Sequence, residues 1–281
     1  MPELPEVETV MRGLAPELEK QTIIKAEVRR PDLRWPFPQH LEESLTDQKV
    51  LRLHRRSKYL LIDLVSTQTL LVHLGMSGRM RVFHPSDASL ATDVQPYKKH
   101  DHVHLYLSSG TQIIYNDARR FGAMDLIRTD EIHQHRLLQH LGPEPFDAEF
   151  SESYLVKKLR GKSASIKSAL LDQRTVAGLG NIYVCEVLFR AGIHPSRKAG
   201  RISKTGAAQL VPIIRQVLQD AIDAGGSSLR DFRHTDGNLG YFQRSFDVYG
   251  REGMDCFTCG SQISRIVQAG RSSFFCRSCQ V

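Results

Sequence analysis

The C-terminal tail of the chain carries four cysteines at a spacing that restricts how this segment can fold. Cys256 and Cys259 form one Cys-x2-Cys pair, Cys276 and Cys279 form another, and sixteen residues separate the pairs. Two such pairs can enclose one tetrahedral metal ion and leave no coordination position open, so the pattern predicts one structural zinc ion. Iron in the same geometry and redox-active thiols are the alternatives.

The residues between the two cysteine pairs alternate between apolar and polar from Ile263 to Phe275. This alternation predicts a β-hairpin, with Ala269 and Gly270 near its tip. Arg271 follows the tip directly, so a metal that orders the hairpin would also fix the position of this arginine.

The N-terminus offers a second constraint, which is chemical. A proline as second residue permits removal of Met1, and the chain then begins with the secondary amine of Pro2 beside the carboxylate of Glu3. An α-amino group titrates near pH 7.7–8, so a useful fraction is a free nucleophile at neutral pH. An iminium formed from proline has no second proton to lose, so it keeps its positive charge and acts as an electron sink.

The residues that follow have the pattern of a helix. Pro5 suits the first helical turn, and apolar residues recur at helical spacing: Leu4, Val7, Val10, Met11 and Leu14. Acidic residues near the start match the positive end of the helix dipole. The simpler interpretation is an ordinary N-terminal helix with an acidic first turn.

The composition indicates a globular protein with a polyanionic partner. The chain has 281 residues, 41% of them hydrophobic and 25% charged, with a formal net charge of +7. An excess of positive charge favours nucleic acid as partner. With no signal peptide and no apolar run of about 18 residues, we expect a monomeric cytoplasmic protein, associated with the nucleoid and not with a membrane. In that compartment clustered cysteines bind metal more often than they form disulfides.

The periodicity changes along the chain and predicts an α+β protein of two domains. Short alternating segments between residues 22 and 128 indicate a β-sandwich or barrel, closed off by the N-terminal helix. We expect strands around these residues: Ile24–Val28, Val50–Leu53, Leu60–Leu64, Val103–Leu107 and Ile113–Tyr115. We expect the N-terminal domain at 1–135, a linker at 136–150, a helical domain at 151–243 and the metal-binding tail at 244–281.

The helical domain is predicted from caps and apolar stripes. Ser151 is an expected N-cap, and helices are expected over Ile166–Leu171 and Ile182–Ala191. A long stripe from Leu210 to Ile222 indicates a further helix, while Cys185 has the position of a small buried hydrophobic residue.

Several polar clusters fit nucleic-acid binding. Arg55, Arg56 and Lys58 precede an apolar strand, and Arg119-Arg120-Phe121 places two cations beside an aromatic ring that can wedge between bases. The Gly178–Asn181 turn before a helix would offer backbone N–H groups to a phosphate. Ordinary solvated surfaces, and a helix–turn–helix corner without a ligand, are the alternatives.

His100, His102 and His104 alternate on one expected strand. The alternation would place them on one face, as in a metal site. No carboxylate or fourth ligand is in register with them, so we expect a solvated strand face instead.

Taken together, these motifs resemble formamidopyrimidine-DNA glycosylase. The matching segments occur in the family's order over almost the whole chain: Pro2–Thr9, Lys58–Leu60, His73–Gly78, Asp117–Gly122, Gly180–Tyr183 and the four cysteines. The resemblance implies a β-sandwich, a helix–two-turn–helix domain and a zinc finger. It also implies a bifunctional glycosylase and lyase of base excision repair that acts on double-stranded DNA containing oxidised purines or abasic sites.

The resemblance assigns roles to individual residues. Pro2 is implied as the nucleophile and Glu3 as the acid, with Lys58 and Arg271 completing the catalytic group and holding phosphates. Met76, Arg119 and Phe121 are implied to fill the space left by an extruded base. The other implied DNA contacts are His73, Asn181, His100 and Lys162.

Two rival functions remain at this stage. An endonuclease VIII-type enzyme would remove oxidised pyrimidines with the same amine, but it lacks the Met76-Arg119-Phe121 pattern. A non-catalytic zinc-finger protein would only bind DNA. The residues Asn238-Leu239 stand where many relatives have Lys-Pro, so the order of preference among damaged purines does not follow from the sequence.

Overall fold

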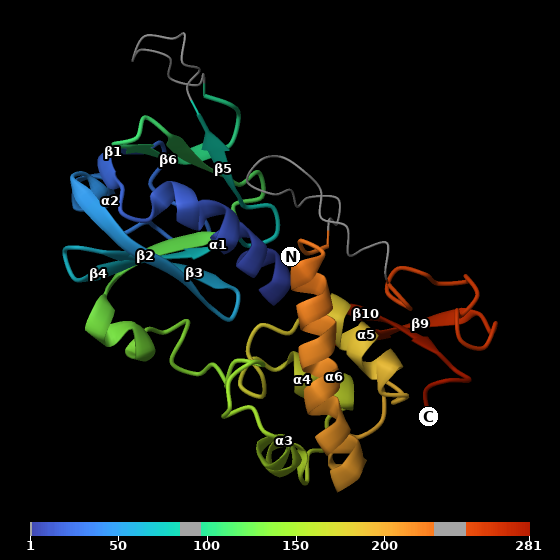
Figure 1. Cartoon of the computed structure of the whole chain (residues 1–281). Helices are drawn as coiled ribbons and strands as arrows, with labels where there is room; N and C mark the ends of the chain where they lie inside the picture. The colour runs from blue at the N-terminus through green and yellow to red at the C-terminus, as the bar shows by residue number, and fades with distance from the viewer. Residues whose placement is uncertain (1, 85–96, 228–245) are drawn as a thin grey trace. The chain divides into compact units, whose positions relative to one another are not determined.

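The structure is a computed structural model that describes residues 2–84, 97–227 and 246–281 (Figure 1). The described residues divide into two compact units. The first contains 2–84, 97–139 and 225–227, and the second contains 140–224 and 246–281. The finer division at residues 135, 150 and 243 stays a prediction. Among the described residues, no helix has the length and apolar character needed to cross a membrane.

The first unit is a β-structure with one long helix. Its elements are, in chain order, α1 (Leu4–Leu18), β1 (Thr22–Val28), α2 (Leu41–Leu45), β2 (Gln48–Arg56), β3 (Tyr59–Leu64), β4 (Gln68–His73), β5 (Arg79–Phe83), β6 (Asp101–Leu107), β7 (Gln112–Asn116), β8 (Ala123–Arg128) and the 3-10 helix η1 (Thr129–Gln134).

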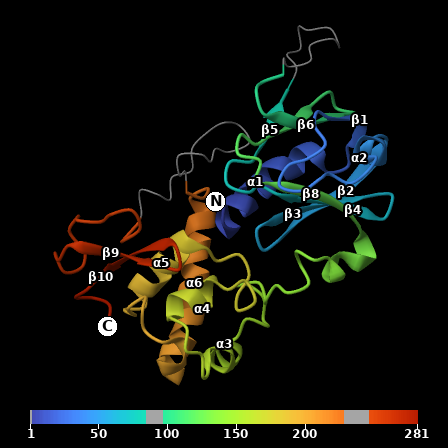
Figure 2. The ribbon, with the colours of Figure 1, turned by 180° about the vertical axis from the view of Figure 1, so that it is seen from behind.

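The eight strands pair antiparallel in the order β5-β7-β6-β1-β2-β3-β4-β8. Strands β1 and β2 share only two residue pairs, which join two four-stranded halves. Figure 1 shows these halves as two layers, and β8 is labelled in Figure 2. Helix α1 contributes Val7, Val10 and Leu14 to a core shared with strands of both halves. The structure therefore confirms the sandwich with its N-terminal helix.

Two connections cross between the halves at the same end of the sandwich. The 74–78 turn leads from β4 to β5, and the 117–122 segment leads from β7 to β8. Both connections start in one half and end in the other, because β4 and β8 pair with each other while β5 and β7 pair with each other.

The second unit is helical and ends in a hairpin. Its elements are α3 (Glu152–Leu159), α4 (Ile166–Leu171), α5 (Asn181–Arg190), η2 (Ala199–Arg201), α6 (Lys204–Asp223), β9 (Ile263–Gln268) and β10 (Arg271–Cys276).

Local signals account for several element ends in this unit. The Ser151 hydroxyl accepts a hydrogen bond from the Tyr154 N–H at 3.2 Å and caps α3, as expected. Ala269 and Gly270 both have positive φ, which suits the tight turn between β9 and β10. The hairpin and the place of Arg271 just after its tip are confirmed. Cys185 is buried on α5, also as expected.

The prediction of a solvated face for the alternating histidines was wrong. His102 and His104 are 5% and 0% exposed. Strand β6 lies inside its half, between β7 and β1, and residues on both of its faces are buried. The His104 ring lies against the rings of Tyr97 and Tyr106. The sequence also predicts a loop at 92–99 and a glycine-rich polar segment at 231–242. Residues 92–96 and all of 231–242 lie outside the described residues.

Candidate functional site

The start of α1 holds the predicted nucleophile and acid. Pro2 is buried and Glu3 is 3% exposed, and Glu3 is the N-cap residue of the helix. The Glu3 N–H donates to Glu6 Oε2 at 2.8 Å. The other oxygen of Glu6, Oε1, accepts from both the N–H and the hydroxyl of Ser227 at 2.8 Å. The Glu6 carboxylate thus fixes the backbone at Glu3 and ties it to a residue far along the chain.

Gly226 allows the backbone before Ser227 to pass close to Glu6. Its φ is +76°, and a Cβ added there would lie 3.3 Å from three atoms of Glu6. A side chain at this position would therefore crowd the carboxylate that holds the N-terminal turn.

Lys58 lies in the turn between β2 and β3 and is 6% exposed. The turn is fixed to the N-terminal half of α1, because Arg55 Nε donates to Glu8 Oε2 at 2.8 Å. Arg55 also donates to the carbonyl of Ser57 at 3.0 Å, and Ser57 has a positive φ of 55°. The β2–β3 turn is thus held in a defined conformation beside the helix that begins with the Pro2 region.

His73 ends β4, directly across from Tyr59 in the β3–β4 pair. Burial, with a smaller effect of the nearby Lys58 and Arg34 charges, lowers the pKa of His73 to about 4. The Gly75 N–H donates to His73 Nδ1 at 3.2 Å. His73 is therefore neutral at pH 7 with its proton on Nε2, which leaves one directed donor for a phosphate oxygen.

The three residues expected to fill the space of an extruded base lie on the two connections between the sandwich halves. Met76 is half-buried in the 74–78 turn, whereas Arg119 and Phe121 are exposed in the 117–122 segment. The Arg119 guanidinium lies 4.9 Å from the centre of the Phe121 ring. The two connections touch, since a Cβ on Gly75 would lie 2.3 Å from the carbonyl carbon of Phe121.

In the second unit, Asn181 is the first residue of α5 and contacts the hairpin. Its Nδ2 donates to the carbonyl of Ser272 at 2.9 Å. The buried Lys167 donates to the same carbonyl at 2.8 Å and to the Ser273 hydroxyl at 2.6 Å. Two side chains from the helices therefore hold the strand that begins with Arg271.

For the other two predicted DNA contacts, Lys162 and His100, the structure shows only long or backbone interactions. Lys162 Nζ lies 3.4 Å from Thr175 Oγ1 and 4.0 Å from an Asp172 oxygen. His100 is half-buried, and its carbonyl accepts from the Asp117 N–H at 3.1 Å. The anion-binding role of the Gly178–Asn181 turn stays a prediction.

The four tail cysteines lie close enough together to hold one metal ion. Their sulfur atoms all lie within 4.8 Å of one another, and no other group of three or more potential ligands occurs in the described residues. Four Zn–S bonds of about 2.3 Å in a tetrahedron place the sulfurs roughly 3.8 Å apart. The sulfurs of Cys259 and Cys276 lie 3.4 Å apart and those of Cys256 and Cys279 lie 3.9 Å apart, close to that spacing.

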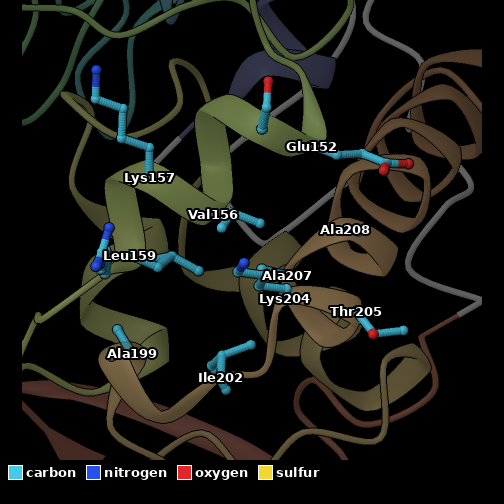
Figure 3. Close-up of a pocket in the computed structure, with 13 residues that line it drawn as sticks. Glu152, Val156, Lys157, Leu159, Ala199, Ile202, Lys204, Thr205, Ala207 and Ala208 are labelled. Atoms are coloured by element: carbon cyan, nitrogen blue, oxygen red, sulfur yellow. The ribbon is translucent and has the colours of Figure 1, made fainter.

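A cavity of about 820 Å³ lies elsewhere, between α3, η2 and the start of α6. Figure 3 shows its lining, with Val156 and Leu159 on one side and Ala207 and Ala208 on the other. None of the predicted site residues lines it, so cavity size alone does not locate the chemistry of this protein.

Three residues that hold the site from distant positions in the chain were not predicted from the sequence. These are Ser227 for the N-terminal turn, Lys167 for the hairpin and the side chain of Asp117 for the two connections. Lys167 had a usable signal, since a lysine inside the apolar run of a helix start must find buried acceptors. Nothing local indicates the partner of Ser227.

The sequence of this chain is similar to those of known proteins over its full length. Residues 1–124 match the N-terminal domain model of formamidopyrimidine-DNA glycosylase, and residues 141–233 match its H2TH domain model. Curated relatives named formamidopyrimidine-DNA glycosylase include those of Ruegeria pomeroyi, 60% identical, and Dinoroseobacter shibae, 58% identical, each over the full length of both chains.

Solved structures named Fpg or MutM have a fold similar to that of this chain. The Lactococcus lactis Fpg in complex with DNA containing an abasic site has a TM-score of 0.89 and 38% identity over 99% of both chains. A structure of MutM with DNA containing carbocyclic 8-oxo-G has a TM-score of 0.88 and 39% identity, again over 99% of both chains.

Proposed function

Because the chain belongs to the formamidopyrimidine-DNA glycosylase family, we propose that it excises oxidised purines from duplex DNA and nicks the strand, with Pro2 as nucleophile. The observation that carries this proposal is the buried pair Pro2 and Glu3 at the start of α1, held by Glu6. A secondary amine beside a fixed carboxylate provides the nucleophile and acid that base excision requires.

The first chemical step forms a bond from the Pro2 nitrogen to C1′ of the extruded nucleotide. The bond from C1′ to the base breaks, and the base leaves with its electron pair and takes up the proton that the Pro2 nitrogen loses. Glu3 gives a proton to the ring oxygen of the sugar, so the ring opens and leaves an iminium between Pro2 and C1′.

The second step uses the iminium as an electron sink. Loss of a C2′ proton places electrons next to the cation, and the 3′ phosphate leaves by β-elimination. A second proton loss expels the 5′ phosphate by δ-elimination, and water then hydrolyses the iminium to free Pro2. One residue thus serves both excision and strand cleavage.

The other residues bind the DNA around this reaction. Lys58 and Arg271 would contact phosphates as cations, whereas His73 and Asn181 would contact them as neutral donors. Met76, Arg119 and Phe121 would occupy the space vacated by the base, with Arg119 donating to the base left unpaired. His100 and Lys162 would add weaker contacts.

The metal site fits a single zinc ion held by Cys256, Cys259, Cys276 and Cys279. Four thiolate ligands close the coordination sphere, so zinc would supply structure and no chemistry of its own. It would order the hairpin that presents Arg271. Acting on chromosomal DNA, the enzyme would work in the cytoplasm at the nucleoid.

Reductive trapping tests the proposal. Chain processed to begin at Pro2, as checked by intact mass, is incubated with borohydride and a duplex containing 8-oxoguanine opposite cytosine. We expect a covalent protein–DNA adduct with the correctly processed chain and none when Pro2 is blocked by acetylation. Absence of an adduct on both lesion and abasic duplexes would leave only DNA binding as the function.

Glu3→Gln separates chemistry from binding. The amide keeps the size of the side chain but cannot deliver a proton as a carboxylic acid does, so excision should fall at least about 100-fold. Binding to a duplex with an uncleavable abasic analogue should stay within about threefold. Excision at the parent rate would refute the acid role of Glu3.

A lesion panel separates the purine from the pyrimidine specificity. Duplexes carrying 8-oxoguanine, a formamidopyrimidine or thymine glycol are compared under single-turnover conditions. We expect the two purine lesions to be excised faster, because Met76, Arg119 and Phe121 are all present. A faster reaction with thymine glycol would favour the endonuclease VIII type.

A further inference from the structure

The carboxylate of Asp117 lies where the two connections between the sandwich halves meet. Asp117 follows β7 directly and its side chain is completely buried, at 0% exposure. Burial of a carboxylate without partners is costly, so its partners show what it holds.

One oxygen of Asp117 binds the 74–78 turn and the start of its own segment. Oδ1 accepts from the Ser77 hydroxyl at 2.5 Å and from the Arg119 N–H at 3.3 Å. The Ser77 oxygen in turn accepts from the Arg119 N–H at 3.0 Å. Ser77 is the direct neighbour of Met76, so this oxygen connects the backbones that carry Met76 and Arg119.

The other oxygen of Asp117 holds the end of its segment. Oδ2 accepts from the Gly122 N–H at 2.8 Å and lies 3.4 Å from the Tyr115 hydroxyl. Gly122 follows Phe121, and Arg120 between the two anchored N–H groups has a positive φ of 57°. This uncommon conformation for a residue with a side chain needs support from its surroundings.

Two histidines hold the backbone of Asp117: His102 in strand β6 and His100, which lies just before that strand. His102 Nε2 donates to the Asp117 carbonyl at 2.8 Å, and the His100 carbonyl accepts the Asp117 N–H at 3.1 Å. Burial lowers the pKa of His102, which suits a neutral ring in this position. Two of the three alternating histidines, His100 and His102, therefore support Asp117.

We propose that Asp117 is a positioning residue for base extrusion, joining the two connections so that Met76, Arg119 and Phe121 enter the DNA as one rigid group. This inference rests on the proposed function, in which those three side chains fill the space of the extruded base. A rigid group enters without first ordering three separate side chains, and that lowers the cost of displacing a stacked base.

Asp117→Asn tests the inference with little change in size. Whichever way the amide is oriented, its NH2 group faces either the Gly122 N–H or the Ser77 and Arg119 donors. We expect excision of 8-oxoguanine from a cytosine duplex to fall about tenfold or more. The fluorescence rise of 2-aminopurine placed next to the lesion, which reports unstacking, should slow by a similar factor.

Asp117→Asn should still form the iminium with an abasic site. Borohydride trapping on a single-stranded oligonucleotide with an abasic site needs no space to be filled, so Asp117→Asn should trap as fast as the parent. Asp63→Asn is the matched control: Asp63 is also buried in the first unit, but it binds Arg52 and Thr69, away from both connections. Asp63→Asn should excise 8-oxoguanine, unstack the neighbouring base and form the trapped adduct at the parent rates.

The outcomes separate the two proposals. If the parent chain fails to trap the single strand, the proposed function fails whatever Asp117→Asn does. If the parent traps and Asp117→Asn excises and unstacks at the parent rate, only the role of Asp117 is overturned. Should Asp117→Asn not fold, Ser77→Ala removes one link and should slow unstacking about threefold; an unchanged rate would overturn the inference.

Discussion

At the scale of single residues, the protonation state of His73 decides how it can bind DNA. The ring has a pKa of about 4, and its Nδ1 accepts from Gly75, so it offers one neutral donor on Nε2. A buried imidazolium beside Lys58 would be costly, and the structure avoids it. The proposed phosphate-binding residues therefore carry fewer positive charges at pH 7 than they would if His73 were protonated.

The stability of the chain should depend on pH through His73. The folded pKa lies below the ordinary value of 6.5, so the unfolded chain binds the proton more tightly. This group's contribution is therefore complete above about pH 6.5 and is lost as the pH falls toward 4. Relative to His73→Asn, whose oxygen can still accept from Gly75, the parent should lose about 2 kcal/mol of unfolding free energy between pH 7.5 and 5.0.

Urea unfolding of both proteins at the two pH values measures this difference, and other titrating groups cancel in the comparison. Between pH 7.5 and 8.5 the difference should not change, which serves as the control. A constant difference down to pH 5.0 would mean that His73 is not buried as a neutral ring.

At the scale of elements, two parts of the fold carry the proposed DNA-binding residues. The paired connections of the sandwich carry Met76, Arg119 and Phe121, and the β9–β10 hairpin carries Arg271. The connections depend on a close backbone approach at Gly75 and on Asp117. The hairpin depends on the metal site and on Lys167 and Asn181, which both bind the Ser272 carbonyl.

Gly75→Ala should disrupt the joined connections. Gly75 has a φ of +63°, and the new Cβ would lie 2.3 Å from the Phe121 carbonyl carbon, so the 117–122 segment must move. Gly110→Ala is a matched control, because Gly110 has a φ of +87° with no atom within 4 Å of an added Cβ.

Both alanine variants should lose about 1–2 kcal/mol from backbone strain in urea unfolding. Only Gly75→Ala should lose more than that and also slow 8-oxoguanine excision, by about tenfold or more. Equal effects of the two variants on excision would contradict the close approach of the two connections.

Cys256→Ser should release the metal and weaken DNA binding. A zinc site missing one thiolate loses most of its affinity, and the hairpin then lacks the element that orders it. We expect less than one zinc per chain by metal analysis and about tenfold weaker binding to a lesion duplex. Cys185 on α5 packs in the same small core as Cys256 and Cys276 but is not one of the four grouped cysteines, so Cys185→Ala should keep its zinc and its affinity. Unchanged affinity of Cys256→Ser would show that the tail does not bind DNA.

At the scale of the whole molecule, both units contribute proposed DNA contacts, and the net charge of +7 adds a general attraction to DNA. Lys58 and His73 belong to the first unit, while Asn181 and Arg271 belong to the second. The cations release counterions from DNA, but neutral donors release none.

The salt dependence of binding should separate these two kinds of contact. In a plot of log K against log salt concentration, Lys58→Met and Arg271→Met should each reduce the slope by about 0.9. His73→Asn and Asn181→Ala should weaken binding at every salt concentration and leave the slope unchanged. Fluorescence anisotropy with a short duplex carrying an abasic analogue measures both. A reduced slope for His73→Asn would show that the ring binds phosphate as a cation.

Much of this protein was predictable from the sequence alone, because the signals are local. Cysteine spacing predicted the metal site, alternation predicted the sandwich and the hairpin, and Ser151 marked the start of α3. The first residues indicated an amine nucleophile from the chemistry of proline. Each of these depends on residues close together in the chain, where spacing and periodicity determine geometry.

Tertiary structure decided what depends on long-range contacts. Burial made His73 neutral and turned His102 from an expected surface residue into the support of Asp117. Ser227 reaches Glu6, and Lys167 reaches Ser272, across more than a hundred residues. No local pattern encodes such pairs, because burial and hydrogen-bond partners are set by which strands and helices pack together.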